Sequence, residues 1–174
     1  STVSAQDSIT SKNYIGVAVL PVPYLFVASF GFERHLSPQL SMEFVAHHYA
    51  IVSLGSEMGT AIYPGIRYYM QSSHSILRNA WIGGNLHVGH YTSEQRGTGL
   101  LSGVDAKSWR YGAGSSVGKK FFIKRFFAEG GLGFYISYRK TYELDRLSNP
   151  LAEAFPESKV IFLPRIIFRL GFHF

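Results

Sequence analysis

The chain ends in the stretch Phe162-Leu-Pro-Arg-Ile-Ile-Phe-Arg-Leu-Gly-Phe-His-Phe174, in which apolar and polar positions alternate. The even-numbered positions are all apolar, whereas the odd-numbered positions include Arg165, Arg169 and His173. Side chains of a β-strand point alternately to its two faces, so this stretch predicts a strand with one apolar and one polar face. It is longer than a typical soluble strand of about five or six residues, and long enough to cross a lipid bilayer.

The same alternation recurs upstream and divides the chain into eight predicted strands. Apolar positions alternate with polar or glycine positions in 26–33, 62–70 and 126–138, for example. An even number of strands lets an antiparallel sheet close, which leaves no unpaired edge in lipid. We therefore expect an all-β fold, a closed eight-stranded antiparallel up-and-down transmembrane β-barrel. The predicted strands are 13–20, 24–36, 39–48, 58–71, 78–92, 107–120, 122–138 and 159–174.

The predicted connections are short at one end of the barrel and longer at the other. Short connections are expected at 36–39, 72–75 and 121, and longer polar ones at 50–57, 92–106 and 140–158, with an unusually short first outer loop at 21–23. Outer-membrane barrels have short periplasmic turns and long outer loops, so we expect both termini in the periplasm. The two longest loops contain apolar residues and are the expected site of partner contacts.

The composition favours a membrane barrel over a soluble domain. Aromatic and charged residues each make up 16% of the 174 residues, whereas soluble domains contain about 25% charged residues. The mean hydropathy of +0.04 is too low for a bundle of membrane helices. The net charge is +6 but the basic residues are scattered, so we expect anionic lipid headgroups and no nucleic acid as partners. The absence of cysteine excludes thiol, zinc–thiolate and disulfide chemistry.

The first residues resemble the end of a secretory signal. Small residues in Val3-Ser-Ala5 precede Gln6, so we expect the mature protein to begin near Gln6. Residues 1–12 are then a signal-peptide remnant and N-terminal tail, and residues 13–174 form the barrel. Together with the strand pattern, this predicts export to the outer membrane of a Gram-negative bacterium.

Four segments of the sequence carry a family resemblance. The ending Arg165–Phe174 resembles the C-terminal assembly signal of outer-membrane barrels, in which the terminal aromatic residues Phe172 and Phe174 would be recognised by the barrel-assembly machinery. The segments Phe32-Glu-Arg34 and Tyr63-Pro-Gly-Ile-Arg-Tyr-Tyr69, with Phe162-Leu-Pro-Arg165, are similar to a family of small barrels of unknown function. That family is related in architecture to the OmpA and OmpX barrels. The resemblance implies no catalytic residues.

Charged residues lie on the predicted inward faces of several strands. Unpaired buried charges are costly, so we expect them to form an ion-pair network that fills a narrow lumen. Arginine outnumbers glutamate in this set, so the alternative of a narrow pore predicts a preference for anions. The predicted lumen network comprises Glu33, Glu43, Arg67, Arg110, Glu129, Arg165 and Arg169, with His87 and His173 on the same face.

No metal or cofactor is expected. The pairs His47-His48 and His87-x-x-His90 place their two rings on opposite faces of a strand, so neither pair chelates alone. A second alternative function is a lipid-modifying enzyme with acyl chemistry near His90, since Thr92 shares its outward face and Ser93 follows.

Aromatic residues near the predicted strand ends are expected to form the two interfacial girdles of the barrel. A filled barrel without a catalytic cluster predicts a non-enzymatic role, as a scaffold or accessory subunit of an outer-membrane assembly. The expected partners are outer-membrane lipid and lipopolysaccharide, and a larger outer-membrane protein. The predicted girdle residues are Tyr68, Tyr91, Trp109, Tyr111, Tyr138, Phe172 and Phe174.

Overall fold

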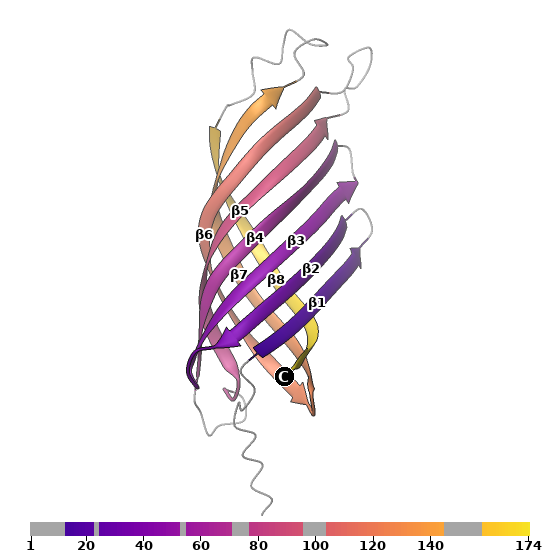
Figure 1. Ribbon diagram of the computed structural model, residues 1–174. Helices are drawn as coiled ribbons and strands as arrows, with labels where there is room; N and C mark the ends of the chain where they lie inside the picture. Colours follow the sequence, from indigo (N-terminus) through magenta and orange to yellow (C-terminus); the bar gives the residue numbers. More distant parts are fainter. Residues whose placement is uncertain (1–12, 23–24, 53–54, 71–76, 96–103, 145–157) are drawn as a thin grey trace, which may run out of the picture.

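The computed structural model of the chain contains eight antiparallel strands (Figure 1). It describes residues 13–22, 25–52, 55–70, 77–95, 104–144 and 158–174. Within these residues, no helix has the length and apolarity needed to cross a membrane. The strands are β1 (Asn13–Val22), β2 (Leu25–His35), β3 (Leu40–Val52), β4 (Gly55–Tyr69), β5 (Ala80–Gln95), β6 (Val104–Ile123), β7 (Phe126–Leu144) and β8 (Ser158–His173).

The strands form a closed ring with up-and-down order. Each strand pairs with the next strand in the sequence, and β1 also pairs with β8. The N–H of Asn13 donates to the carbonyl oxygen of Phe174 at 3.3 Å, and the N–H of Phe174 donates to the carbonyl oxygen of Asn13 at 3.1 Å. The start of β1 therefore lies beside the C-terminus. The prediction of eight antiparallel strands in up-and-down order is confirmed.

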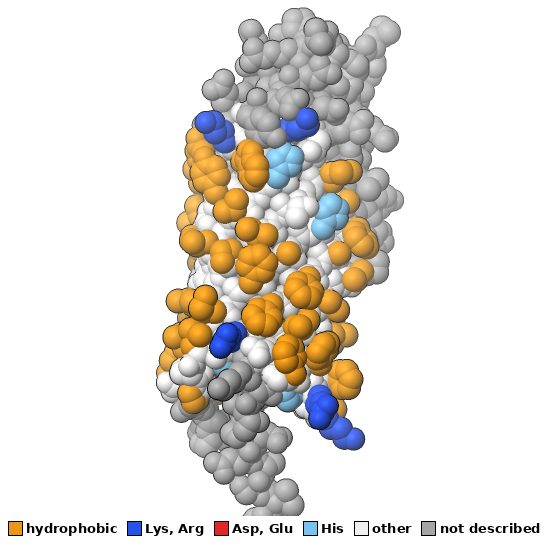
Figure 2. Space-filling model, viewed as in Figure 1, with side chains coloured by type: hydrophobic (Ala, Val, Ile, Leu, Met, Phe, Trp, Pro, Cys, Tyr) orange, Lys and Arg blue, Asp and Glu red, His pale blue; other side chains and the backbone are white. Residues whose placement is uncertain are grey.

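The two faces of each strand differ as the alternation predicts. In β8, Phe162, Ile166 and Phe168 are exposed on the outside of the ring, whereas Arg165 and Arg169 are buried inside it. Figure 2 shows hydrophobic side chains over the middle of one outer face and Lys or Arg side chains toward its two ends. The outer wall is thus apolar, and the ring places its polar groups in its interior.

Large side chains fill the narrow interior, and glycines leave room for them. Trp81 is fully buried, and a Cβ on Gly118 would lie 2.6 Å from the Cζ2 atom of Trp81. A Cβ on Gly59 would lie 2.1 Å from the Cδ1 atom of Tyr91. Both distances are far below van der Waals contact, so these glycines allow the aromatic rings to cross the interior.

Several predicted boundaries are wrong because strand pairing continues into polar sequence. β3 extends to Val52, and β5, β6 and β7 extend into the predicted loops 92–106 and 140–158. Backbone hydrogen bonds need no apolar side chain, so polar residues such as Thr92 and Lys107 still pair. The tight turn predicted at Phe121 lies instead at Lys124–Arg125, because Phe121 and Ile123 continue the outward face of β6.

One predicted girdle residue lies in the interior. Tyr91 is only 2% exposed, because His90 and Thr92, its neighbours in β5, have the opposite orientation. The other predicted girdle residues are exposed. Predictions for residues 1–12, for the turn 72–75 and for the central parts of the two long loops fall outside the described residues.

Candidate functional site

A cluster of three carboxylates and three cations fills part of the interior. The carboxylates come from β2, β3 and β7, and the cations come from β4, β6 and β8. Every member is at most 4% exposed, so the charges are held away from bulk solvent. Equal numbers of opposite charges make the group neutral overall. The members, called here the ion-pair cluster, are Glu33, Glu43, Arg67, Lys120, Glu129 and Arg169.

Arg67 occupies the centre of the ion-pair cluster. Its Nη1 atom lies 3.0 Å from Oε2 of Glu33, and its Nη2 atom lies 2.7 Å from Oε1 of Glu129. Its Nε atom pairs with Glu43. The guanidinium carbon lies 3.8 Å from the centre of the Trp81 ring. The planar guanidinium group offers donors in several directions, which lets one residue join three carboxylates from three strands.

Lys120 and Arg169 complete the charge balance. The Nζ atom of Lys120 lies 2.6 Å from Oε2 of Glu33. The Nη2 atom of Arg169 lies 2.5 Å from Oε1 of Glu43 and 3.7 Å from Oε1 of Glu129. Lys120 is absent from the predicted network because it lies in a basic run, although Ser116 already marks the even positions of β6 as inward.

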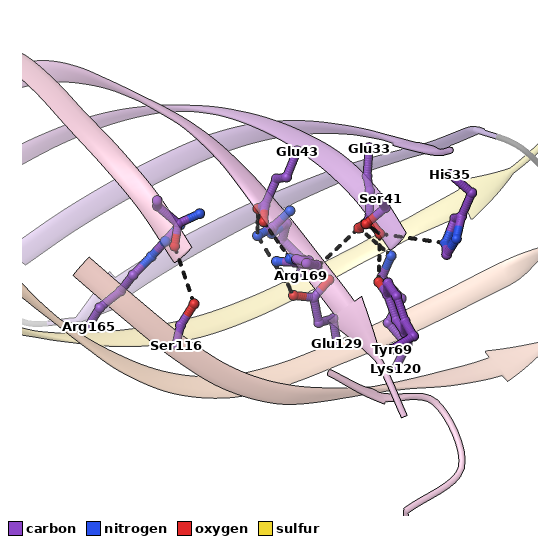
Figure 3. A network of polar contacts seen from close by, with 12 residues as sticks. Glu33, His35, Ser41, Glu43, Tyr69, Ser116, Lys120, Glu129, Arg165 and Arg169 are labelled. Carbon is purple, nitrogen blue, oxygen red and sulfur yellow. Dashed lines mark hydrogen bonds and ion pairs between the residues drawn. The ribbon is translucent and has the colours of Figure 1, made fainter. Parts of the chain in front are cut away.

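Glu33 accepts hydrogen bonds from neutral groups as well. The hydroxyl of Ser41 donates to Oε1 of Glu33 at 2.7 Å, and the hydroxyl of Tyr69 donates to the same atom at 2.6 Å. The Nε2 atom of His35 lies 3.6 Å from that oxygen (Figure 3). A buried carboxylate needs several hydrogen-bond donors to offset its lost hydration. Glu33 has four such donors, from Ser41, Tyr69, Arg67 and Lys120.

Arg110 does not join the ion-pair cluster. Its Nη2 atom lies 2.6 Å from Oε1 of Glu57, and its Nη1 donates to the hydroxyl of Tyr49 at 3.2 Å. The guanidinium carbon lies 4.1 Å from the centre of the Tyr91 ring. The side chain of Glu57 is 24% exposed, so this pair is only partly buried. The expectation that Arg110 shares one network with the other charges is wrong, because β6 places it ten residues from Lys120.

Arg165 also lies apart from the cluster. It donates to the hydroxyl of Tyr135, and its Nη2 lies 3.3 Å from Nε2 of His47. Its guanidinium carbon is 4.9 Å from the centre of the Tyr63 ring. Within the described residues, no carboxylate oxygen lies within 4.0 Å of Arg165. The predicted single network is thus three separate groups, and aromatic rings rather than carboxylates surround Arg165.

The histidine pairs point to opposite faces as predicted. His47 and His87 are directed inward, whereas His48 is exposed and its Nδ1 lies 3.0 Å from the hydroxyl of Thr60. His173 lies near the C-terminal end, with its Nε2 atom 2.8 Å from the carbonyl oxygen of Lys124. Among the described residues, no three His, Asp or Glu side chains gather as a metal site requires.

The outward surface around His90 is the place suggested for acyl chemistry. The His90 ring lies edge-on to Trp109, with 5.2 Å between the ring centres. The hydroxyl of Ser93 donates to the carbonyl oxygen of Ala106 at 3.4 Å, so it is engaged with backbone. Thr92 is half-buried at the same end of β5. The enzymatic alternative remains a hypothesis.

The predicted assembly signal lies on the outer wall. Phe172 and Phe174 are both exposed, and their ring centres are 6.1 Å apart. The backbone of Phe174 is bonded to Asn13, so the C-terminal residues also close the ring. A recognition element at this position would present its aromatic rings outward while its backbone is already paired.

Comparisons with known proteins add no family to these observations. No protein family, no curated protein and no solved structure matches the chain. The buried ion-pair cluster and the exposed apolar wall are therefore the observations on which a functional proposal depends.

Proposed function

We propose that this chain is a non-enzymatic outer-membrane β-barrel that serves as a scaffold or accessory subunit of an outer-membrane protein assembly. The observation that carries the proposal is a ring with its apolar side chains outside and its charges inside. In water such an outer wall would leave large apolar side chains exposed on every strand, at a large free-energy cost. Lipid removes that cost.

The location follows from the same argument. A ring of this kind belongs in the outer membrane of a Gram-negative bacterium, with both termini on the periplasmic side and lipopolysaccharide around the other end. The barrel-assembly machinery would insert it by recognising Phe172 and Phe174. Exposed Trp109, Tyr111 and Tyr138 suit the outer headgroup level.

The filled interior supports a structural role over transport. The ion-pair cluster is buried and its opposite charges pair with one another, which supports a filled lumen rather than a path for ions. The narrow anion-preferring pore is therefore less well supported than the scaffold. Contacts with other molecules would then be made by the outer wall and the two ends of the barrel.

The membrane part of the proposal is tested by placing a charge on the outer wall. Phe168 lies toward the middle of β8 and Val160 lies near its end, and both are exposed. We expect Phe168→Arg to lower the free energy of unfolding in phosphatidylcholine vesicles by about 2–4 kcal/mol, and Val160→Arg by about 0–1 kcal/mol. Urea titration measures both. Equal effects at the two positions would contradict a lipid-facing wall.

The assembly part of the proposal is tested by native extraction. The full chain is solubilised from outer membranes in mild detergent and separated by size, and the proteins in its fraction are quantified. We expect one larger membrane protein at constant stoichiometry through successive columns. A chain that elutes alone at the size of its own micelle would contradict a subunit role while leaving the membrane location intact.

A further inference from the structure

The ring is closed by a short pairing between β1 and β8. Their register pairs run only from Tyr14 opposite His173 to Val17 opposite Leu170. On the side of these pairs away from the C-terminus, the described residues of β1 pair only with β2 and those of β8 only with β7. Figure 1 shows the two strands diverging above the C-terminus. Residues 158–169 of β8 therefore have one edge without a neighbouring strand in the described chain; this is called the free edge.

The free edge follows from the lengths of the two strands. β1 has 10 residues and β8 has 16. If the observed register continued to the end of β1, Val22 would face Arg165. Residues 158–164 would still extend past the end of β1. Complete pairing between these two strands therefore cannot cover the edge.

The direction of the backbone groups identifies the donors on the free edge. Phe174 donates its N–H across the seam to Asn13, whereas His173 donates to Arg125 on the other side. In an antiparallel strand, successive residues direct their N–H and C=O groups to alternate sides. The even-numbered residues therefore face the seam. On the free edge these include Val160, Phe162, Ile166 and Phe168.

Prolines in the two strands agree with this assignment. Pro164 has an even number, so the N–H that it lacks would face the free edge rather than β7. Pro21 has the same parity as Asn13, whose N–H faces β8, and it lies in the part of β1 that has no β8 partner. Proline within a sheet is confined to edges and irregularities. Pro21 and Pro164 thus lie on the two sides of the seam, and neither removes a backbone hydrogen bond to β2 or β7.

The interior remains closed behind the free edge. Ala18, Arg165, Ile167 and Arg169 point inward along the seam, and each is less than 9% exposed. A lipid entering the interior through the seam would have to displace these packed side chains. The unmet requirement at the seam is hydrogen bonding of the backbone, which acyl chains do not supply.

We propose that the free edge of β8 binds an antiparallel β-strand of a partner membrane protein. This inference rests on the proposed subunit role and names the surface that would serve it. An added strand satisfies a row of backbone donors and acceptors, as in other cases of strand addition to a sheet edge. The exposed row Val160, Phe162, Ile166 and Phe168 requires that the partner strand also present apolar side chains to lipid.

A second copy of this chain fits the edge less well. Copies in one membrane share an orientation, so the β8 strands of two copies would meet in parallel rather than antiparallel. The β1 strand of another copy has the right direction, but it is as short as the β1 already present. The partner strand must run from the periplasmic side outward and extend along residues 158–169.

The first experiment tests whether the seam is open, and the absence of cysteine gives a clean background. Val17 and Leu170 are register partners, and Val19 and Phe168 would be partners if pairing continued. We expect the double variant V17C/L170C to form a disulfide on mild oxidation of the protein in detergent micelles. The double variant V19C/F168C should remain reduced under the same conditions. Equal disulfide yields would show that the seam closes, and would overturn the proposal.

The second experiment measures strand addition with a named probe. A fluorescent peptide of residues 126–144 has the sequence of β7, which already pairs antiparallel with β8. We expect saturable binding of this peptide to the full chain in micelles, and none of a scrambled peptide. Ile166→Pro should weaken binding at least tenfold, because it removes a donor of the free edge.

The matched control for that variant is Ile166→Ala, which keeps the backbone N–H and should bind the peptide within about twofold of the unchanged chain. Ile166→Pro should keep the heat-modifiable migration of the folded ring, since its lost N–H does not bond β7. Equal weakening by both substitutions, or no peptide binding, would overturn the edge proposal. If Ile166→Pro instead co-purifies with the native partner as well as the unchanged chain does, the edge proposal fails while the subunit role stands.

Discussion

At the scale of single residues, the interior depends on which cation meets which carboxylate. Arg67 contacts Glu33, Glu43 and Glu129, and a lysine at this position would offer a single nitrogen. Lys120 suits its own position because it meets one carboxylate, Glu33, and lies 4.1 Å from the centre of the Tyr14 ring. The cluster is thus specific at the level of individual side chains, and removal of one charge leaves its partners uncompensated.

The first prediction concerns Glu129, whose side chain has no exposed surface. Glu129→Gln keeps the shape of the side chain but leaves Arg67 and Arg169 with one carboxylate fewer. We expect the free energy of unfolding to fall by about 3–5 kcal/mol, the usual cost of breaking a buried ion pair. Urea titration in vesicles followed by tryptophan fluorescence measures the change.

Two control variants show whether burial causes this loss. Glu57→Gln breaks the partly exposed pair with Arg110 and should cost about 1 kcal/mol or less. The double variant E129Q/R169Q restores the balance of charge and should unfold at higher urea than Glu129→Gln alone. An effect of Glu129→Gln no larger than that of Glu57→Gln would contradict the role given to the cluster.

At the scale of elements, alternation fixes the strands, and turn geometry fixes where they reverse. β6 and β7 are joined by Lys124–Arg125, and Lys124 has a φ of 56°. This left-handed conformation is unfavourable for a residue with a Cβ atom, and glycine adopts it freely. Asn79, at φ 61° before β5, is a residue type that tolerates it. The β6–β7 turn therefore carries strain that one substitution removes.

The second prediction is that Lys124→Gly stabilises the ring. Relief of the left-handed strain should raise the free energy of unfolding by about 1 kcal/mol. Arg125→Gly is the matched control, because Arg125 has no positive φ and gains nothing from glycine. The measurement is the urea midpoint of unfolding of the two variants under the same conditions. A midpoint of Lys124→Gly at or below that of Arg125→Gly would contradict the strain at Lys124.

At the scale of the whole molecule, the ring differs from an open channel because the neutral ion-pair cluster fills part of its interior. Charges from β2, β3, β4, β6, β7 and β8 meet within the interior, so the cluster joins six of the eight strands. In the proposed role, the molecule would act through its surfaces, including the free edge of β8.

The third prediction is that the chain conducts no steady ion current. Reconstituted into planar lipid bilayers, the unchanged protein should show no channel steps, because the buried ion pairs block the lumen. A stable ohmic conductance that disappears with Arg169→Glu would support the anion-preferring pore instead. Insertion is verified beforehand by resistance of the ring to protease in vesicles.

Eight strands, their antiparallel order and the inward or outward direction of most side chains could be predicted from the sequence, although Tyr91 and Lys120 were exceptions. These properties are local, because a strand alternates its side chains whatever lies next to it. Phe168 outside and Arg169 inside were therefore predictable, as was the opposition of His47 and His48. The misplaced turn at Phe121 shows where a local pattern of adjacent apolar residues misled the prediction.

Which inward charges meet could not be predicted from the sequence and is seen only in the folded ring. Arg67, Arg110 and Arg165 all face the interior. Their positions along the strands, and the tilt and stagger of those strands, give each arginine a different set of partners. The same holds for the seam, where the relative lengths and register of β1 and β8 leave one edge of β8 without a neighbouring strand among the described residues. Contacts between distant strands depend on how the whole sheet curves and closes, and no window of sequence contains that information.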